Sequence, residues 1–136
     1  MARILVVGQD VILLNLISSI LRHDGHTVVE TTDPMVALTI AEEQTQAIDL
    51  VLTEVEMQPI SGFELVKRLI LERINIPAQF ISGFPTIAGV IGSTYGADAV
   101  IRKPFTAPAL RKGVAKFLAK CKRRSNTGRE LGIKAA

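Results

Sequence analysis

The apolar residues of this chain fall into short blocks that follow two alternating patterns. Continuous runs rich in β-branched residues predict buried strands at residues 4–7, 27–29, 49–54, 79–82 and 99–101. Between these runs, apolar residues recur at helical spacing and predict helices at residues 13–21, 34–41, 63–70, 86–95 and 108–118. Because each crossover is near the minimum length, this order predicts an α/β fold, a five-stranded parallel sheet doubly wound with five helices.

Charge divides the chain into two parts. Residues 1–101 carry 5 basic and 12 acidic groups, whereas residues 102–136 carry 11 basic groups and 1 acidic group. The helical stripe ends after Leu118, so we expect a folded domain over residues 1–123 and a basic, disordered C-terminal tail over 124–136. A basic tail can attract nucleic acid, but charge blocks are common in disordered chain ends, so nucleic acid is not the partner we expect.

Composition argues against several other classes of protein. No apolar block reaches the roughly 18 residues of a membrane-spanning helix, and the apolar run near the N-terminus is too short for a signal peptide. The single cysteine, Cys121, and the two histidines have no recognisable zinc spacing. The sequence also lacks a dinucleotide-binding glycine motif, a Walker lysine and an evident nucleophile–base pair. We therefore expect a cytoplasmic protein that is not an enzyme and has neither membrane contact nor a structural metal.

Polar and charged residues follow several of the predicted strands directly. In doubly wound sheets, binding residues gather at the carboxyl ends of the strands, beside the point where the strand order reverses. The residues at these positions are Gly8–Asp10, Glu54–Glu56, Ser82–Gly83 and Lys103–Pro104. We expect the functional site to be built from them.

Two motifs at these strand ends resemble those of response-regulator receiver domains of two-component signalling, in particular the chemotaxis type. They are Lys103-Pro104-Phe105 after Gly96-Ala97-Asp98, and the run 49–57 that leads into Ser61-Gly62. The resemblance covers roughly residues 3–121. It implies a flavodoxin-like fold and a signalling protein as partner, namely a histidine kinase or an output protein.

The same resemblance implies roles for individual residues. Glu54 stands where receivers carry the phosphorylated aspartate, and Ser82 and Lys103 match the residues that contact the phosphoryl group. Val100 stands at the position of the rotating switch aromatic. Because a small β-branched side chain has no comparable inward and outward states, the usual aromatic read-out would be absent.

The chain departs from the receiver pattern at the acidic residues that hold magnesium. Those positions carry Gly8 and Gln9, and the neighbouring Asp10 is expected to cap a helix. Since Mg²⁺ prefers carboxylate oxygens in near-octahedral geometry, we expect its binding to be weak or absent and no other cofactor. Phosphoryl transfer depends on that metal to neutralise developing charge, so loss of the site should nearly abolish turnover.

Glu54 has two open placements in this interpretation. Its carboxylate either lies against Lys103 and fills part of the phosphoryl site, or faces solvent at the strand end. The sequence thus predicts a pseudo-receiver that acts by protein binding without phosphorylation. Two alternatives stay open: a receiver that still accepts phosphate in an atypical pocket, and a small nucleic-acid binder that uses the basic C-terminus.

The fourth predicted helix is unusually poor in charge, because Asp98 is the one charged residue between positions 74 and 101. If Ile87, Val90, Ile91 and Tyr95 face inward, the outward positions are Ala88, Gly89, Gly92, Ser93 and Gly96. A surface of small, uncharged residues suits a homodimer through the fourth helix, fifth strand and fifth helix. The glycines can equally leave this helix frayed and mobile.

Overall fold

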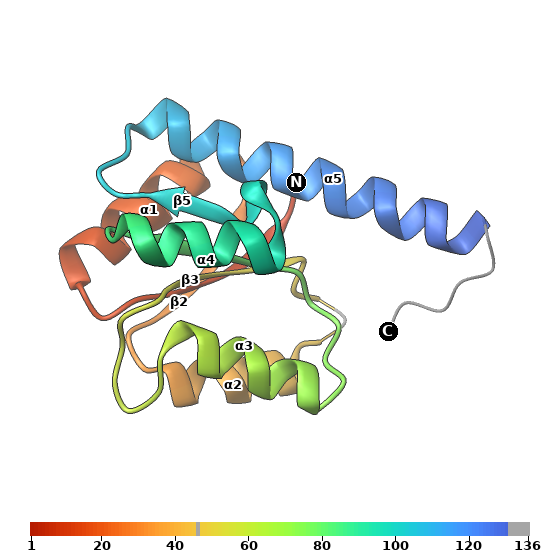
Figure 1. Cartoon of the computed structure of the whole chain (residues 1–136), viewed down its shortest axis with the longest axis horizontal. Coiled ribbons are helices and arrows are strands. Elements are labelled where there is room, and N and C mark those ends of the chain that lie inside the picture. Colours follow the sequence, from red (N-terminus) through yellow and green to blue (C-terminus); the bar gives the residue numbers. More distant parts are fainter. Residues whose placement is uncertain (46, 131–136) are drawn as a thin grey trace.

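The computed structural model describes residues 1–45 and 47–130, with side chains as far as Lys122 (Figure 1). Five parallel strands form one sheet in the order β2-β1-β3-β4-β5. The strands are β1 (Arg3–Val7), β2 (Thr27–Thr31), β3 (Leu50–Glu54), β4 (Ala78–Ser82) and β5 (Val100–Arg102). The predicted five-stranded parallel sheet is confirmed.

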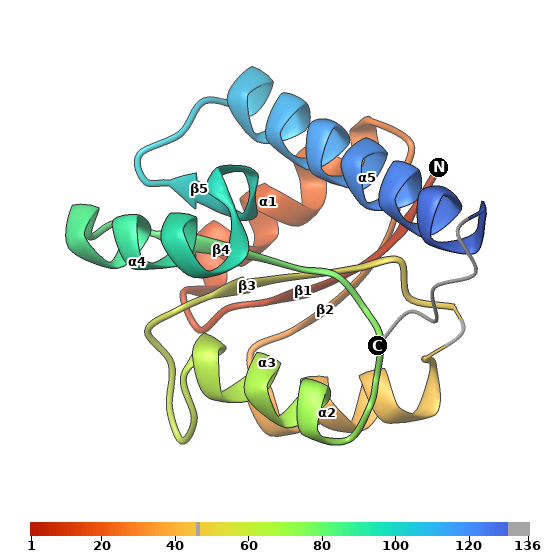
Figure 2. The same ribbon diagram turned by 45° about the vertical axis from the view of Figure 1, so that its right-hand side comes forward.

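Helices cover both faces of this sheet. They are α1 (Val11–His23), α2 (Pro34–Glu43), α3 (Gly62–Leu71), α4 (Pro85–Tyr95) and α5 (Ala107–Glu130), with a short 3-10 helix at Ala97–Ala99. In Figures 1 and 2, α2 and α3 lie on one face of the sheet, and α1 and α5 lie on the other. The predicted doubly wound arrangement with five helices is also confirmed.

The central strands are buried on both faces, as their continuous apolar runs predict. Ile4–Val7 of β1 are all buried, and so is every residue of β3. One core cluster packs β1 and β3 residues against α1 and α5, and a second packs the opposite faces of these strands against α2 and α3. The strand order reverses between β1 and β3, so the carboxyl ends of these two strands flank the expected binding edge.

Polar residues in the first turns fix where three of the helices begin. The side chain of Asp10 accepts a hydrogen bond from the backbone N–H of Leu13 at 3.1 Å, which makes Asp10 the N-cap of α1. Asp33 caps α2 and Ser61 caps α3 in the same way. These caps satisfy backbone donors that would otherwise lack partners, and they turn the chain sharply after each strand.

The prediction of which face of α4 is buried was wrong at two positions. Ala88 was expected on the outer face but is only 6% exposed, whereas Val90 was expected inside and is 55% exposed. Ala88 and Tyr95 are three and four residues from the fully buried Ile91, so they share its face, while Val90 is turned about 100° away. Because α4 has no charged residue, its sequence does not mark the outer face.

Helix α5 is longer than predicted. Its backbone continues to Glu130, past the domain boundary expected at residue 123. Residues 119–127 include several good helix formers and no proline, so nothing in this stretch forces the helix to end. Residues 131–136 of the expected tail lie outside the described residues, and the disorder of 124–136 stays a prediction.

Candidate functional site

Glu54 ends β3 at the centre of the sheet's carboxyl edge, and its carboxylate is held at both oxygens. Oε1 lies 2.8 Å from Nζ of Lys103, and Oε2 accepts a hydrogen bond of 3.0 Å from the backbone N–H of Gln9. The residue is only 6% exposed. Of the two open placements, the structure has the one in which Glu54 lies against Lys103.

Gly8 leaves the space that this carboxylate occupies. A Cβ atom at residue 8 would lie 2.6 Å from Oε2 of Glu54, closer than such atoms approach one another in proteins, and 3.1 Å from its Cδ, which is a tight contact. The absence of a side chain at position 8 and the long side chain at position 54 therefore belong to one packing arrangement. Gly8 is itself buried.

Gln9 faces the loop that follows β3, and not the carboxylate of Glu54. Its side-chain Nε2 donates to the carbonyl oxygen of Gln58, and its Oε1 accepts from the backbone N–H of Gln58 at 2.9 Å. One donor and the acceptor oxygen of the amide are therefore engaged by the backbone of a single residue. The neighbouring Asp10 is exposed and engaged as the cap of α1.

This set of donors does not fit Mg²⁺, the ion that the resemblance implies. Position 8 offers no side-chain oxygen, the Gln9 amide is bonded to Gln58, and both oxygens of Glu54 already accept from cationic or backbone donors. Within the described residues, no three His, Cys, Asp or Glu side chains are grouped so that they could hold a metal ion. Magnesium requires several hard oxygen ligands in octahedral geometry, which these side chains do not present.

Lys103 and Ser82 meet through their backbones. The backbone N–H of Lys103 donates to the carbonyl oxygen of Ser82 at 2.9 Å, which carries the lysine side chain over the end of β3. The Ser82 hydroxyl is buried and accepts from the backbone N–H of Phe84 at 3.2 Å. Among the contacts described for it, the hydroxyl bonds its own loop and not Glu54 or Lys103.

Val100 lies beside a row of three aromatic rings, those of Phe63, Phe80 and Tyr95, although it is not aromatic itself. It is half-buried and pairs in register with Phe80 of β4. The ring of Phe80 lies 5.3 Å from that of Phe63 and 5.1 Å from that of Tyr95, each in a tilted arrangement. This row joins α3 and α4 to β4, so these aromatic contacts are made by residues other than Val100, which the resemblance places at the switch position.

The face formed by α4, β5 and α5 combines small residues with one ionic cluster. Gly89 and Ser93 are exposed and Gly92 is half-buried. Asp98, just before β5, lies 2.9 Å from Nζ of Lys120 and 3.5 Å from Nζ of Lys116, both on α5. The hydrogen bond from Lys120 lowers the pKa of the Asp98 carboxyl, against the opposing effect of its burial, and the charge of Lys116 lowers the pKa further.

Two contributors to the site were not predicted from the sequence. One is the backbone of Gln58, which no side-chain motif marks. The other is Gly62, where a Cβ atom would lie 2.2 Å from the backbone oxygen of Glu54. Gly62 belongs to the Ser61-Gly62 motif that follows the third predicted strand, so the sequence did carry a signal for it.

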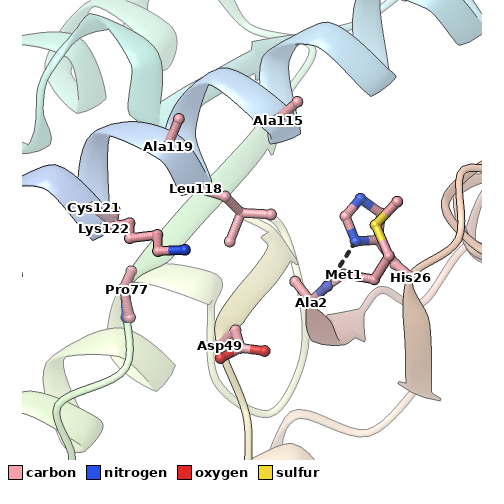
Figure 3. Close-up of a pocket in the computed structure, with 10 residues that line it drawn as sticks. All are labelled: Met1, Ala2, His26, Asp49, Pro77, Ala115, Leu118, Ala119, Cys121 and Lys122. Atoms are coloured by element: carbon pink, nitrogen blue, oxygen red, sulfur yellow. Dashed lines mark hydrogen bonds between the residues drawn. The ribbon is translucent and has the colours of Figure 1, made fainter.

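A hollow of about 570 Å³ lies at the opposite edge of the sheet (Figure 3). Ala2, Asp49 and Pro77, which line it, immediately precede β1, β3 and β4. Figure 3 also shows Nδ1 of His26 accepting the backbone N–H of Ala2 at 3.2 Å. None of the predicted site residues lines this hollow, so the ionic site and the hollow are separate features.

Comparison with known proteins finds response regulators and solved receiver domains among the relatives. The two-component response regulator-like protein PRR37 of Oryza sativa subsp. indica is 31% identical over 134 residues, which cover 96% of this chain and 18% of that protein. The chain thus spans less than a fifth of this relative. The receiver domain of the hybrid histidine kinase CckA is 31% identical, with a TM-score of 0.69 and coverage of 85% of this chain and 98% of that one.

A response regulator receiver domain protein from Clostridium thermocellum shares the fold at 24% identity, with a TM-score of 0.78 over 90% of this chain and 98% of that one. No helix in the described part of the chain is long and apolar enough to cross a membrane. The family model for the response regulator receiver domain matches residues 4–115, most of the folded body. The chain therefore belongs to the response regulator receiver domain family.

Proposed function

We propose that this receiver domain works without phosphorylation, as a signalling module that binds a protein partner. The observation that carries the proposal is the ion pair of 2.8 Å between Glu54 and Lys103. In it, the carboxylate of Glu54 occupies the position against Lys103 that the resemblance assigns to a phosphoryl oxygen. The single cysteine of the chain is compatible with a reducing compartment, and a cytoplasmic location is part of the proposal.

Three features of the site oppose aspartyl-type phosphoryl transfer. Each oxygen of the carboxylate that would attack already accepts a hydrogen bond, so attack through either one would compete with that bond. The ammonium of Lys103 is already paired with a carboxylate, with which an incoming phosphoryl group would have to compete. Gly8 and Gln9 supply no carboxylate for the divalent cation that neutralises charge in the transition state.

The proposal is tested by amide NMR titration of the full chain with Mg²⁺ and beryllofluoride, a mimic of the phosphoryl group. The resonances of Glu54, Ser82 and Lys103 should not move. A variant with Gly8→Asp, Gln9→Asp and Glu54→Asp combined is the positive control, because groups that act as one unit must be restored together. Movement of these resonances in the wild type, or a Mg²⁺-dependent phosphate on Glu54 by mass spectrometry, would favour the alternative of a still phosphorylatable receiver.

The partner is proposed to be a histidine kinase, an output protein or a second copy of the chain. A homodimer would use the face formed by α4, β5 and α5, where Gly89 and Ser93 are exposed. Gly89→Arg is the sharpest probe of this face, since a Cβ atom there meets no atom within 4 Å. Light scattering should then find a folded monomer where the wild type is a dimer; a monomeric wild type at high concentration would exclude the homodimer.

A further inference from the structure

The amide of Gln9 joins two loops that come from different parts of the chain. Gln9 lies between β1 and α1, whereas Gln58 lies between β3 and α3. One amide uses its donor and its acceptor on the carbonyl and the N–H of the same residue, Gln58. Paired bonds of this kind fix both the distance between the loops and their relative orientation.

The backbone of Gln9 extends this connection into the ionic site. Its N–H donates to Oε2 of Glu54, Oε1 of Glu54 is paired with Lys103, and the N–H of Lys103 donates to the carbonyl of Ser82. A continuous set of hydrogen bonds therefore runs across the carboxyl ends of β1, β3, β4 and β5. All its members are protein groups, and the set contains one positive and one negative charge.

The resemblance implies that a receiver with acidic residues at positions 8 and 9 would bind a divalent cation there, beside residue 54. The carboxylates needed for that are absent here, and the amide of Gln9 lies between the loops instead. We propose that Gln9 is a positioning residue that replaces the bound cation: it ties the loop after β3 to the turn after β1 and so holds its own N–H against Glu54. This inference rests on the proposed function, because it explains how the site keeps its shape without a metal.

The test is hydrogen exchange of the Gln58 backbone amide, measured by NMR in the full chain. Gln9→Met keeps the length of the side chain and removes both bonds, so this amide should exchange about tenfold faster. Gln9→Glu keeps the acceptor for the Gln58 N–H but loses the donor, and should give an intermediate rate. Gln58→Ala is the matched control, because the bridge uses only the backbone of that residue, and its rate should equal that of the wild type.

The wild-type rate should also be the same with and without Mg²⁺. Equal rates for Gln9→Met and the wild type, with both proteins folded, would overturn the inference, as would slower exchange of the wild type on addition of Mg²⁺. If Gln9→Met does not fold, the comparison of Gln9→Glu with Gln58→Ala decides the matter. A phosphate on Glu54 would instead overturn the proposed function and leave the exchange result standing, so the two failures are distinguishable.

Discussion

Replacing Gly8 with alanine should destabilise the protein when residue 54 is glutamate, and should not do so when it is aspartate. The added Cβ atom would lie 2.6 Å from Oε2 of Glu54 and 3.2 Å from its Cγ. Since contacts below 3.0 Å are not tolerated, the carboxylate must move by several tenths of an ångström. It is held by Lys103 at 2.8 Å and by the N–H of Gln9 at 3.0 Å, so any such movement lengthens at least one of these bonds.

The expected size of the effect follows from two opposing contributions. A hydrogen bond to a charged group contributes about 1.5–3 kcal/mol, most of which a displaced carboxylate would lose. Alanine in place of glycine restricts the unfolded chain and returns about 0.4–1 kcal/mol. Gly8→Ala should therefore cost about 1–2 kcal/mol in the wild type. Glu54→Asp withdraws the carboxylate by one methylene, so in that background Gly8→Ala should be neutral or slightly stabilising.

Urea denaturation of the wild type, both single variants and the double variant gives the coupling between the two positions. With a slope of about 2 kcal/mol/M, Gly8→Ala alone should lower the midpoint by about 0.5–1 M. Gly89→Ala is the matched control: its Cβ meets nothing within 4 Å, and it should stabilise helix α4 by about 0.5–1 kcal/mol. Equal costs of Gly8→Ala in both backgrounds would refute the steric link between Gly8 and Glu54.

Three further predictions concern single positions. Lys103→Ala should cost about 1–3 kcal/mol, because it leaves the buried carboxylate of Glu54 without a counter-charge, and an unchanged urea midpoint would contradict this. Gly62→Ala should cost roughly 3 kcal/mol or more, because its Cβ would meet backbone at 2.2 Å; a circular dichroism melt equal to that of the wild type would disprove the close approach. Asp98→Asn should lower the urea midpoint near neutral pH. Because the pKa of Asp98 is lowered in the folded protein, its ionised carboxyl stabilises the fold at pH values above the ordinary pKa of 3.8, and this contribution is lost as the pH falls through the lowered pKa. If the urea midpoints of the wild type and Asp98→Asn still differ by the same amount at the lowest pH at which both stay folded, the ion pairs with Lys116 and Lys120 are not the cause.

The sheet and the position of the site could be predicted because both depend on simple patterns. Continuous apolar runs mark β1 and β3 as central strands, and parallel strands bring their carboxyl ends to one edge. Glu54 and Lys103 were therefore expected near each other. The choice between an ion pair and a solvent-facing Glu54 could not be made from the sequence, because it depends on whether the backbone at Gly8 leaves room for a carboxylate.

Features that depend on the path of a loop, or on a helix without a polar face, could not be predicted. The bridge from Gln9 ends on the backbone of Gln58, whose position is set by an irregular loop without periodicity. The buried face of α4 was misassigned at Ala88 and Val90 because this helix carries apolar and small residues on all of its sides and no charged residue. The contact of Ser82 with a phosphoryl group, which the resemblance implies, stays a prediction; in the structure its hydroxyl accepts a hydrogen bond from the backbone N–H of Phe84 in its own loop.

The aromatic row on β4 also gives this protein a local optical reporter. The chain has no tryptophan and one tyrosine, Tyr95, at the last residue of α4. Its ring is held in a tilted contact 5.1 Å from that of Phe80, an asymmetric environment in which tyrosine acquires a near-ultraviolet circular dichroism signal. The tyrosine band therefore follows the docking of one helix, whereas the far-ultraviolet signal follows the whole backbone. If α4 detaches before the sheet melts, the two wavelengths will give different transition temperatures, and a single spectrometer can measure the stability of that helix by itself.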